Sequence, residues 1–284
     1  MIPTSFDYQR ATSLDDALSR LAKAGGGAKL IAGGHSLVPL MKLRLSEPQV
    51  LIDIARIPGM AGIRDEGGAI VIGAGTVHHE VATSSLVRQQ CPVMAEAARA
   101  IGDPQVRNRG TMGGSVAHAD PAADYPAALI AAGAEIQIKG SKGTRSVKAE
   151  DFFIDLFTVD LQPDEIITAV RVPKAKASAY EKLYQRASHF AIVGVGVALE
   201  ASGGTITSAR VGLTGASSHA IRLTGVESML VGKKASEETI AAAAEKADAG
   251  VDPVNSDIHA SDEYRRAMIR VFVKRALKAA AARA

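Results

Sequence analysis

The amino-acid sequence predicts a protein of the α+β class with more than one domain. Helical periodicity in some segments, short apolar runs typical of strands in others, and a stretch of small and basic residues at 172–178 carry this prediction. The chain has 284 residues, of which 47% are hydrophobic and 22% charged, as in ordinary water-soluble globular proteins. That length suffices for one large domain or two to three smaller ones.

The first elements are a helix, a strand and a glycine turn. Ser13 precedes an acidic first turn and apolar residues at helical spacing, so we expect a capped amphipathic helix that ends at the glycines 25–27. The run 28–32 is short and apolar and predicts a buried strand that leads into Gly33-Gly34. Further strands are expected at 50–54 and 69–73.

The middle of the chain predicts one helix over 86–101, followed by a glycine-rich polar loop over 103–115. We place the main domain boundary at 172–178. Beyond it, two apolar runs at 192–199 and 205–213, joined by Ser202-Gly203-Gly204, indicate a hairpin. Ser236 and Ser261 then each begin a helix, the second of which runs to the Ala-rich end of the chain.

Charge and cysteine content exclude several classes of function. The formal net charge is only +3, whereas nucleic-acid binders concentrate far more positive charge, so we expect no nucleic-acid partner. The single cysteine, Cys91, allows no internal disulfide and no cluster or zinc site built from thiolates of this chain alone, and we expect it to be buried and structural. No secretory signal and no apolar run long enough to span a membrane is evident, so we expect a cytoplasmic protein.

Two glycine-rich loops are the candidate binding elements. Ala32-Gly33-Gly34-His35-Ser36 directly follows a strand, and its glycines would let backbone N–H groups approach an anion. Thr111-Met112-Gly113-Gly114-Ser115 has the same features, with Arg107 and Arg109 nearby as counter-charge. Together the loops suit a diphosphate, although each alone could be a plain turn. Neither has the spacing of a Walker A or Rossmann motif.

The acidic and histidine residues allow two interpretations. Asp120 and Asp124 could accept hydrogen bonds from ribose hydroxyls beside the second loop. Alternatively, His118, Asp120 and Asp124 could bind the metal of a hydrolase. The residues His78-His79-Glu80 also suggest a metal site, but adjacent side chains point in different directions and seldom bind one ion together. A polar helix start is the better explanation for them. No catalytic triad is evident, and no catalytic residue is assigned. A cluster of Lys182, Arg186 and His189 follows the linker, where it could face a cleft.

These glycine loops, followed by Asp120-Pro121-Ala122-Ala123-Asp124, resemble the FAD-binding medium subunits of molybdenum hydroxylases, the family of aerobic carbon monoxide dehydrogenase and xanthine dehydrogenase. The resemblance covers the whole chain and includes the last helix, from Ser261 onward. It implies a vanillyl-alcohol-oxidase-like (PCMH-type) FAD-binding domain over 1–173, with subdomains of about 1–60 and 61–173. A C-terminal α+β domain of antiparallel sheet and helices would follow over 178–284.

The resemblance also implies the positions that contact FAD. The first loop, on one side of the diphosphate, comprises Leu30, Ile31, Ala32, Gly33, Gly34, His35, Ser36 and Leu37. The second, on the other side, comprises Thr111, Gly113, Gly114 and Ser115. Asp124 would lie near the ribose or adenosine, Ile101 and Ile167 would pack on the cofactor, and Lys182 would lie close to the flavin ring.

In such a complex a large subunit oxidises the substrate at a molybdenum–pterin centre and a small subunit carries two iron–sulfur clusters. This chain would receive the electrons on FAD and pass them to an external acceptor, within a dimer of heterotrimers. Positive charge near the ring would favour an anionic reduced flavin. Substrate and acceptor stay open, and so do two rival hypotheses: the metal-dependent hydrolase, and a non-catalytic binding module whose glycine loops are only turns.

Overall fold

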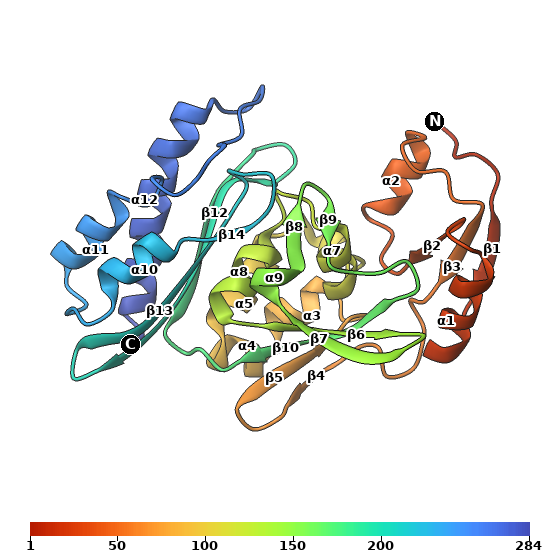
Figure 1. Cartoon of the computed structure of the whole chain (residues 1–284), viewed down its shortest axis with the longest axis horizontal. Helices are drawn as coiled ribbons and strands as arrows, with labels where there is room; N and C mark the ends of the chain where they lie inside the picture. Colours follow the sequence, from red (N-terminus) through yellow and green to blue (C-terminus); the bar gives the residue numbers. More distant parts are fainter.

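The computed structural model describes residues 1–284 and contains three main sheets, which follow one another along the molecule, and one further sheet of two strands (Figure 1). The first sheet is parallel, with strand order β1-β3-β2. Its part of the chain comprises β1 (Asp7–Arg10), α1 (Leu14–Lys23), β2 (Ala28–Ile31), α2 (Leu37–Lys42) and β3 (Val50–Asp53). Ser13 caps α1 as predicted, because its hydroxyl accepts a hydrogen bond from the backbone N–H of Asp16.

The second sheet is antiparallel, with the order β4-β5-β10-β6-β7. Its strands are β4 (Ile63–Asp65), β5 (Ala69–Gly73), β6 (Glu135–Gly140), β7 (Gly143–Lys148) and β10 (Ile166–Pro173), and β8 (Phe153–Asp155) pairs separately with β9 (Thr158–Val159). The helices of this part are α3 (His78–Thr83), α4 (Ser85–Gln90), α5 (Pro92–Ala100), α6 (Pro104–Arg107), α7 (Met112–His118), α8 (Asp124–Ala132) and α9 (Ala149–Phe152).

Two expectations for this part are wrong. The single helix over 86–101 is two helices, α4 and α5, because Pro92 disfavours helical backbone at Cys91, which is non-helical at φ −153° and ψ 69°. The expected loop over 103–115 contains α6 and the start of α7. Asp103 and Thr111 cap these helices by accepting hydrogen bonds from the N–H groups of Val106 and Gly114.

The third sheet is antiparallel, in the order β11-β12-β13-β14. Its part comprises β11 (Ser178–Tyr184), β12 (Ala191–Ser202), β13 (Thr205–Thr214), β14 (Ile221–Arg222), α10 (Thr224–Leu230), α11 (Glu237–Ala244) and α12 (Asp262–Ala281). The predicted hairpin is confirmed: Gly203 and Gly204 form its turn, with φ of +57° and +75°. Ser236 and Ser261 cap α11 and α12 as predicted.

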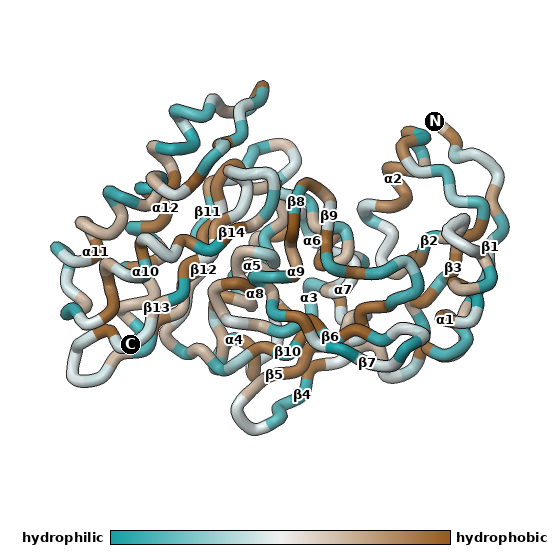
Figure 2. Tube along the Cα trace, in the orientation of Figure 1, coloured by the Kyte–Doolittle hydropathy of each residue, from teal (hydrophilic) through white to brown (hydrophobic).

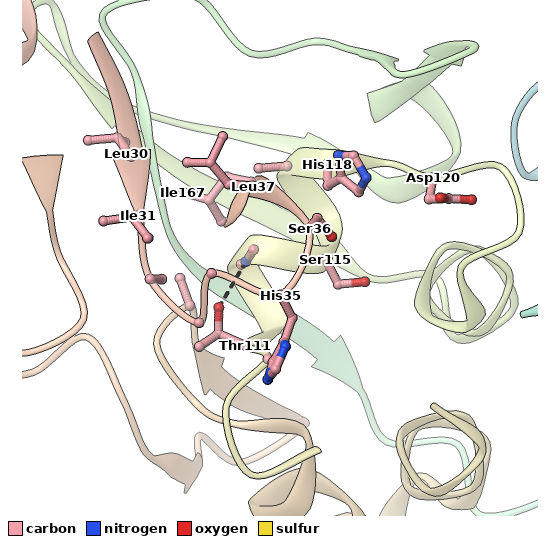
Figure 3. Close-up of a pocket in the computed structure, with 18 of the residues that line it drawn as sticks. Leu30, Ile31, His35, Ser36, Leu37, Thr111, Ser115, His118, Asp120 and Ile167 are labelled. Atoms are coloured by element: carbon pink, nitrogen blue, oxygen red, sulfur yellow. Dashed lines mark hydrogen bonds between the residues drawn. The ribbon is translucent and has the colours of Figure 1, made fainter. Parts of the chain in front are cut away.

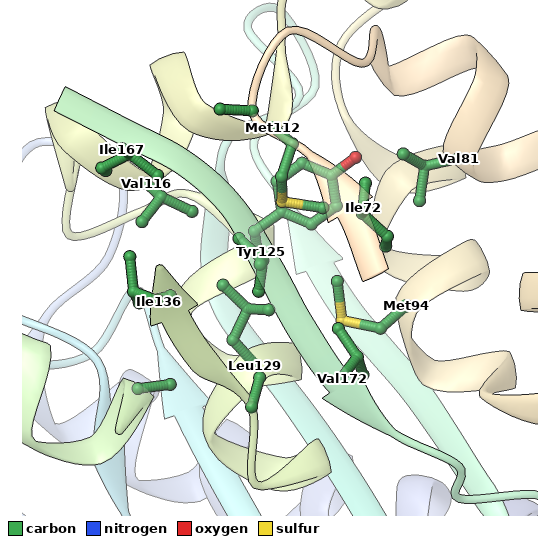
Figure 4. Packing of buried hydrophobic residues seen from close by; sticks show 14 of the residues in the cluster. Ile72, Val81, Met94, Met112, Val116, Tyr125, Leu129, Ile136, Ile167 and Val172 are labelled. Carbon is green, nitrogen blue, oxygen red and sulfur yellow. The ribbon is translucent and has the colours of Figure 1, made fainter. Parts of the chain in front are cut away.

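The core consists of two hydrophobic clusters. The larger one packs α3, α5 and α8 against the second sheet, and Figure 4 shows Tyr125 and Leu129 of α8 beside Met94, Met112 and Ile136. The smaller cluster packs α10, α11 and α12 against the third sheet, whose other face is covered by α5 and α8. Apolar residues concentrate along these inner strands (Figure 2). None of the helices combines the length and the hydropathy that a membrane span needs.

Candidate functional site

A cavity of about 840 Å³ is lined by residues from all three parts of the chain. The first part contributes β2 and the loop before α2, the second contributes α7 and its approach, and the third contributes residues 188–190. Every residue predicted to contact the cofactor lines this cavity except Lys182. They are Leu30, Ile31, Ala32, Gly33, Gly34, His35, Ser36, Leu37, Ile101, Thr111, Gly113, Gly114, Ser115, Asp120, Asp124 and Ile167. Figure 3 shows the loop carrying His35 and Ser36 beside helix α7, with Ser115 and His118.

The first glycine loop, residues 32–36, presents unused backbone donors. None of its five N–H groups donates to an acceptor within the chain, in contrast to the strand before it. Gly34 has a φ of +75°, a conformation that favours glycine. A Cβ atom on Gly33 would lie 2.3 Å from the carbonyl oxygen of Arg109, so only glycine permits the two loops to touch. The loop is therefore a concave set of backbone donors suited to an anion.

The second glycine loop differs from the prediction, because four of its five backbone N–H groups are already occupied. The N–H of Met112 donates to the Thr76 carbonyl at 2.9 Å, and that of Gly113 donates to the Ala74 carbonyl at 2.8 Å. Gly114 donates to the Thr111 hydroxyl at 3.1 Å, and Ser115 donates to the Thr111 carbonyl at 3.0 Å. The amides of residues 112–115 thus anchor α7, whereas the Thr111 N–H, which has no acceptor in the chain, and the Ser115 hydroxyl remain available to a ligand.

The two arginines expected as counter-charge do not line the cavity. Arg107 instead donates from Nη1 to the carbonyl oxygens of Ile101 and Gly102, each at 2.9 Å. Cationic and imidazole side chains that do line the cavity are Lys29, His35, His78, His118 and His189. Lys29, the one cationic side chain among them, was not among the positions predicted to contact the cofactor.

Asp124, which lines the cavity, and Lys182 form a buried ion pair in its wall. Each side chain is 5% exposed, and a carboxylate oxygen lies 2.8 Å from Nζ. The Tyr180 hydroxyl also donates to this carboxylate, at 2.7 Å, and Lys182 Nζ donates to the Ala100 carbonyl at 2.9 Å. Burial raises the pKa of the Asp124 carboxyl, and Lys182 and Tyr180 offset part of that rise. Lys182 is therefore tied to the wall rather than exposed in the cavity.

His78 and His189 line the cavity, and neither was among the residues predicted to contact the cofactor. His78 begins α3 as expected of a polar helix start, yet it is 4% exposed and its Nδ1 has no hydrogen-bond partner. Burial, with smaller contributions from His35 and Arg107, lowers the pKa of His78 to about 4. His189 has a φ of +62°, unusual for a residue other than glycine. Their sequence context places His78 at a helix start and His189 in a cluster that could face a cleft, and neither signal points to a cofactor.

The metal-binding hypothesis fails on geometry. Nowhere in the chain do three His, Cys, Asp or Glu side chains come together as a metal site would need. Asp120 accepts the N–H of Ala122 within its own turn, Asp124 is paired with Lys182, and the His118 ring lies 5.2 Å from that of Phe157. Cys91 is buried, and burial raises the pKa of its thiol to about 12, in agreement with the predicted structural role.

Comparisons with known proteins agree with this geometry. Residues 4–175 match the family described as FAD binding domain in molybdopterin dehydrogenase, and residues 178–280 match the CO dehydrogenase flavoprotein C-terminal domain. The carbon monoxide dehydrogenase medium chain of Hydrogenophaga pseudoflava is 43% identical, over the whole of this chain and 99% of that protein. Subunit alpha of the 6-hydroxypseudooxynicotine dehydrogenase complex of Paenarthrobacter nicotinovorans is 41% identical, over the whole of this chain and 97% of that protein.

Solved structures give the same result. The carbon monoxide dehydrogenase of H. pseudoflava that lacks the Mo-pyranopterin moiety superposes with a TM-score of 0.95 at 44% identity, covering the whole of this chain and 99% of the matched chain. No finding favours a hydrolase. The resemblance found in the glycine loops thus holds along the whole length, and the chain belongs to the FAD-binding medium subunits of the molybdenum hydroxylases.

Proposed function

We propose that the cavity holds FAD and that the loop 32–36 binds its diphosphate. The observation that carries this proposal is the row of five backbone N–H groups without an acceptor in the chain, at the wall of a cavity of about 840 Å³. Cavities of this size bind extended cofactors, and convergent amides compensate the charge of phosphate oxygens. Lys29 lines the same region and adds positive charge, and the His35 imidazole adds a further hydrogen-bonding group.

The other lining residues take roles that follow from their chemistry. Ser115 donates a hydroxyl to the diphosphate from the opposite side, and the carboxylate of Asp120 accepts from ribose hydroxyls. Ile101 and Ile167 supply apolar walls for the flavin ring. Both carboxylate oxygens of Asp124 already accept hydrogen bonds from Tyr180 and Lys182, so Asp124 organises the wall rather than binding ribose.

The chain then acts in electron transfer. Bound FAD supplies the ability to accept and release electrons, and the protein supplies its position and surroundings. A chain with one buried cysteine ligates no iron–sulfur cluster by itself, so the electrons come from a partner. We assign two iron–sulfur clusters to a small subunit and a molybdenum–pterin centre to a large subunit, in a cytoplasmic dimer of heterotrimers that delivers electrons to an external acceptor.

The substrate of the complex is not assigned to this chain. Relatives of nearly equal identity, 43% and 41%, are named for carbon monoxide and for 6-hydroxypseudooxynicotine. Similarity at this level does not separate such different substrates. The large subunit, which carries the molybdenum centre in this assignment, is where the substrate would be recognised.

A titration of the apo-protein with FAD tests the binding loop. In Gly33→Ala, the added Cβ would meet the Arg109 carbonyl oxygen at 2.3 Å and displace the loop. Gly68→Ala is the matched control, because no atom lies within 4 Å of its Cβ position. We expect Gly33→Ala to weaken FAD binding by at least about tenfold, since a displacement that costs 1.4 kcal/mol has that effect. Equal affinities in Gly33→Ala and the wild type would exclude this loop as the diphosphate site.

A further inference from the structure

Three consecutive carbonyl groups at the C-terminal end of helix α5, those of residues 100–102, are each held by a side chain from elsewhere in the chain. Lys182 Nζ donates to the Ala100 oxygen at 2.9 Å. Arg107 Nη1 donates to the oxygens of Ile101 and Gly102, each at 2.9 Å. His189 Nδ1 lies 3.1 Å from the Gly102 oxygen, as a donor in the tautomer that carries its proton there. The three side chains come from β11, α6 and the loop between β11 and β12.

Part of this arrangement is ordinary helix chemistry. The last carbonyls of a helix lack intrahelical partners, and cationic side chains satisfy them and favour the negative end of the helix dipole. The helix ends here because Gly102, at φ +45°, and Pro104 do not continue it. Here, however, side chains from three separate elements converge on three consecutive carbonyls.

The held segment forms a wall of the proposed cofactor cavity. Ile101 and Gly102 both line the cavity, and so does His189. His189 keeps a φ of +62° while its ring reaches Gly102, and a non-glycine residue adopts this conformation only where its surroundings hold it there. Residues 100–102 and the loop that carries His189 are therefore fixed to each other at the edge of the cavity.

The charges in this group are not equivalent. The ammonium of Lys182 is neutralised by Asp124 at 2.8 Å. Arg107 forms no ion pair with any carboxylate and binds only carbonyl oxygens through its guanidinium. The uncompensated positive charge behind this wall is thus that of Arg107.

We propose that Lys182, Arg107 and His189 form a clamp that fixes residues 100–102 as a rigid wall against the ring system of the bound cofactor. All three act as positioning residues, through the carbonyls that they hold, and the inference rests on the proposed FAD site. A planar ring packs against Ile101 only if the backbone that carries Ile101 does not move. The clamp fixes that backbone before the cofactor binds.

Paired variants of Arg107 and His189 test the clamp. Arg107→Met removes both hydrogen bonds and the charge, and Arg99→Met is its control, because exposed Arg99 contacts none of the three carbonyls. His189→Ala removes the donor, whereas His189→Asn keeps an amide donor and tolerates positive φ. The readouts are the FAD dissociation constant, the visible circular dichroism of bound flavin, and the melting temperature of the apo-protein.

We expect Arg107→Met to raise the FAD dissociation constant by at least about tenfold, as the loss of charged hydrogen bonds does. Its flavin circular dichroism should also weaken, while Arg99→Met matches the wild type. His189→Ala should show the same changes to a smaller degree, and His189→Asn should restore them. A lower apo melting temperature with unchanged affinity and flavin spectrum would reduce the three side chains to a helix cap and overturn the proposal.

The two proposals fail in different ways. A wild-type chain that takes up no FAD refutes the FAD site itself. A wild-type chain that binds FAD, with both Arg107→Met and His189→Ala binding it equally well, refutes only the clamp. If Arg107→Met does not fold, the His189 pair decides, because His189 lies in a surface loop and contributes one hydrogen bond.

Discussion

The buried pair of Asp124 and Lys182 connects the second and third parts of the chain, so breaking it should destabilise the protein strongly. Both side chains are 5% exposed and their charged atoms are 2.8 Å apart. In Lys182→Met the carboxylate stays buried, with the Tyr180 hydroxyl as its remaining side-chain donor. Removing one partner of a buried pair costs about 3–5 kcal/mol. At roughly 2 °C per kcal/mol for a chain of this size, the melting temperature should fall by about 6–10 °C.

A double-mutant cycle isolates the pair. Asp124→Asn still accepts the Tyr180 hydroxyl but leaves the Lys182 charge buried with the Ala100 carbonyl as its partner. The double variant buries no charge at this place, so it should be more stable than either single variant, with a coupling energy of about 2 kcal/mol or more. Unfolding of the four apo-proteins in urea, followed by circular dichroism, measures these differences. Single variants within about 0.5 kcal/mol of the wild type would refute the reasoning, because exposed pairs behave in that way.

Three further predictions concern individual residues. In the folded chain the pKa of His78 is about 4, below the ordinary 6.5, so the unfolded chain binds the extra proton and stability falls from pH 6.5 toward 4. At pH 4.5 this loss should reach about 2–3 kcal/mol in urea unfolding, and a His78→Gln variant without such a pH dependence would support the assignment. Cys91 is fully buried with a thiol pKa of about 12, so a thiol reagent should label it in urea and not in the native chain; rapid native labelling would contradict its burial. Ser261→Ala should cost about 1 kcal/mol, seen as a lower melting temperature, because the hydroxyl caps α12; an unchanged melting temperature would contradict the cap.

Elements with strong local signals were predictable from the sequence. Ser13, Ser236 and Ser261 begin helices as expected, and Gly203-Gly204 form the hairpin turn. In each case the residues that decide the structure are neighbours in the chain. Capping and turn chemistry therefore suffice without tertiary information.

Elements that depend on distant partners were missed. The strand β1 is polar and mostly exposed, and it exists through its parallel pairing with β3. Helix α7 has glycines at its second and third positions, which lower helix propensity, so the segment was expected to be a loop. Its start is fixed by hydrogen bonds to the carbonyls of Ala74 and Thr76, far away in the sequence.

The candidate site likewise combines features that the local sequence predicts with features that depend on distant parts of the chain. The glycine loops mark the cavity, and the resemblance locates part of its lining. Whether an amide is free depends on the tertiary structure: the N–H groups at 32–36 are unused, whereas those at 112–115 are bonded. The burial of Lys182 with Asp124, and the inclusion of His78 and His189 in the lining, likewise depend on the packing of segments remote in sequence.

The most direct test of the central claim is the visible absorption spectrum of the purified chain, with quantification of the cofactor released by heat. The account predicts flavin absorption bands and close to one FAD per chain, either as purified or after incubation with added FAD. A colourless protein that takes up no FAD would contradict it.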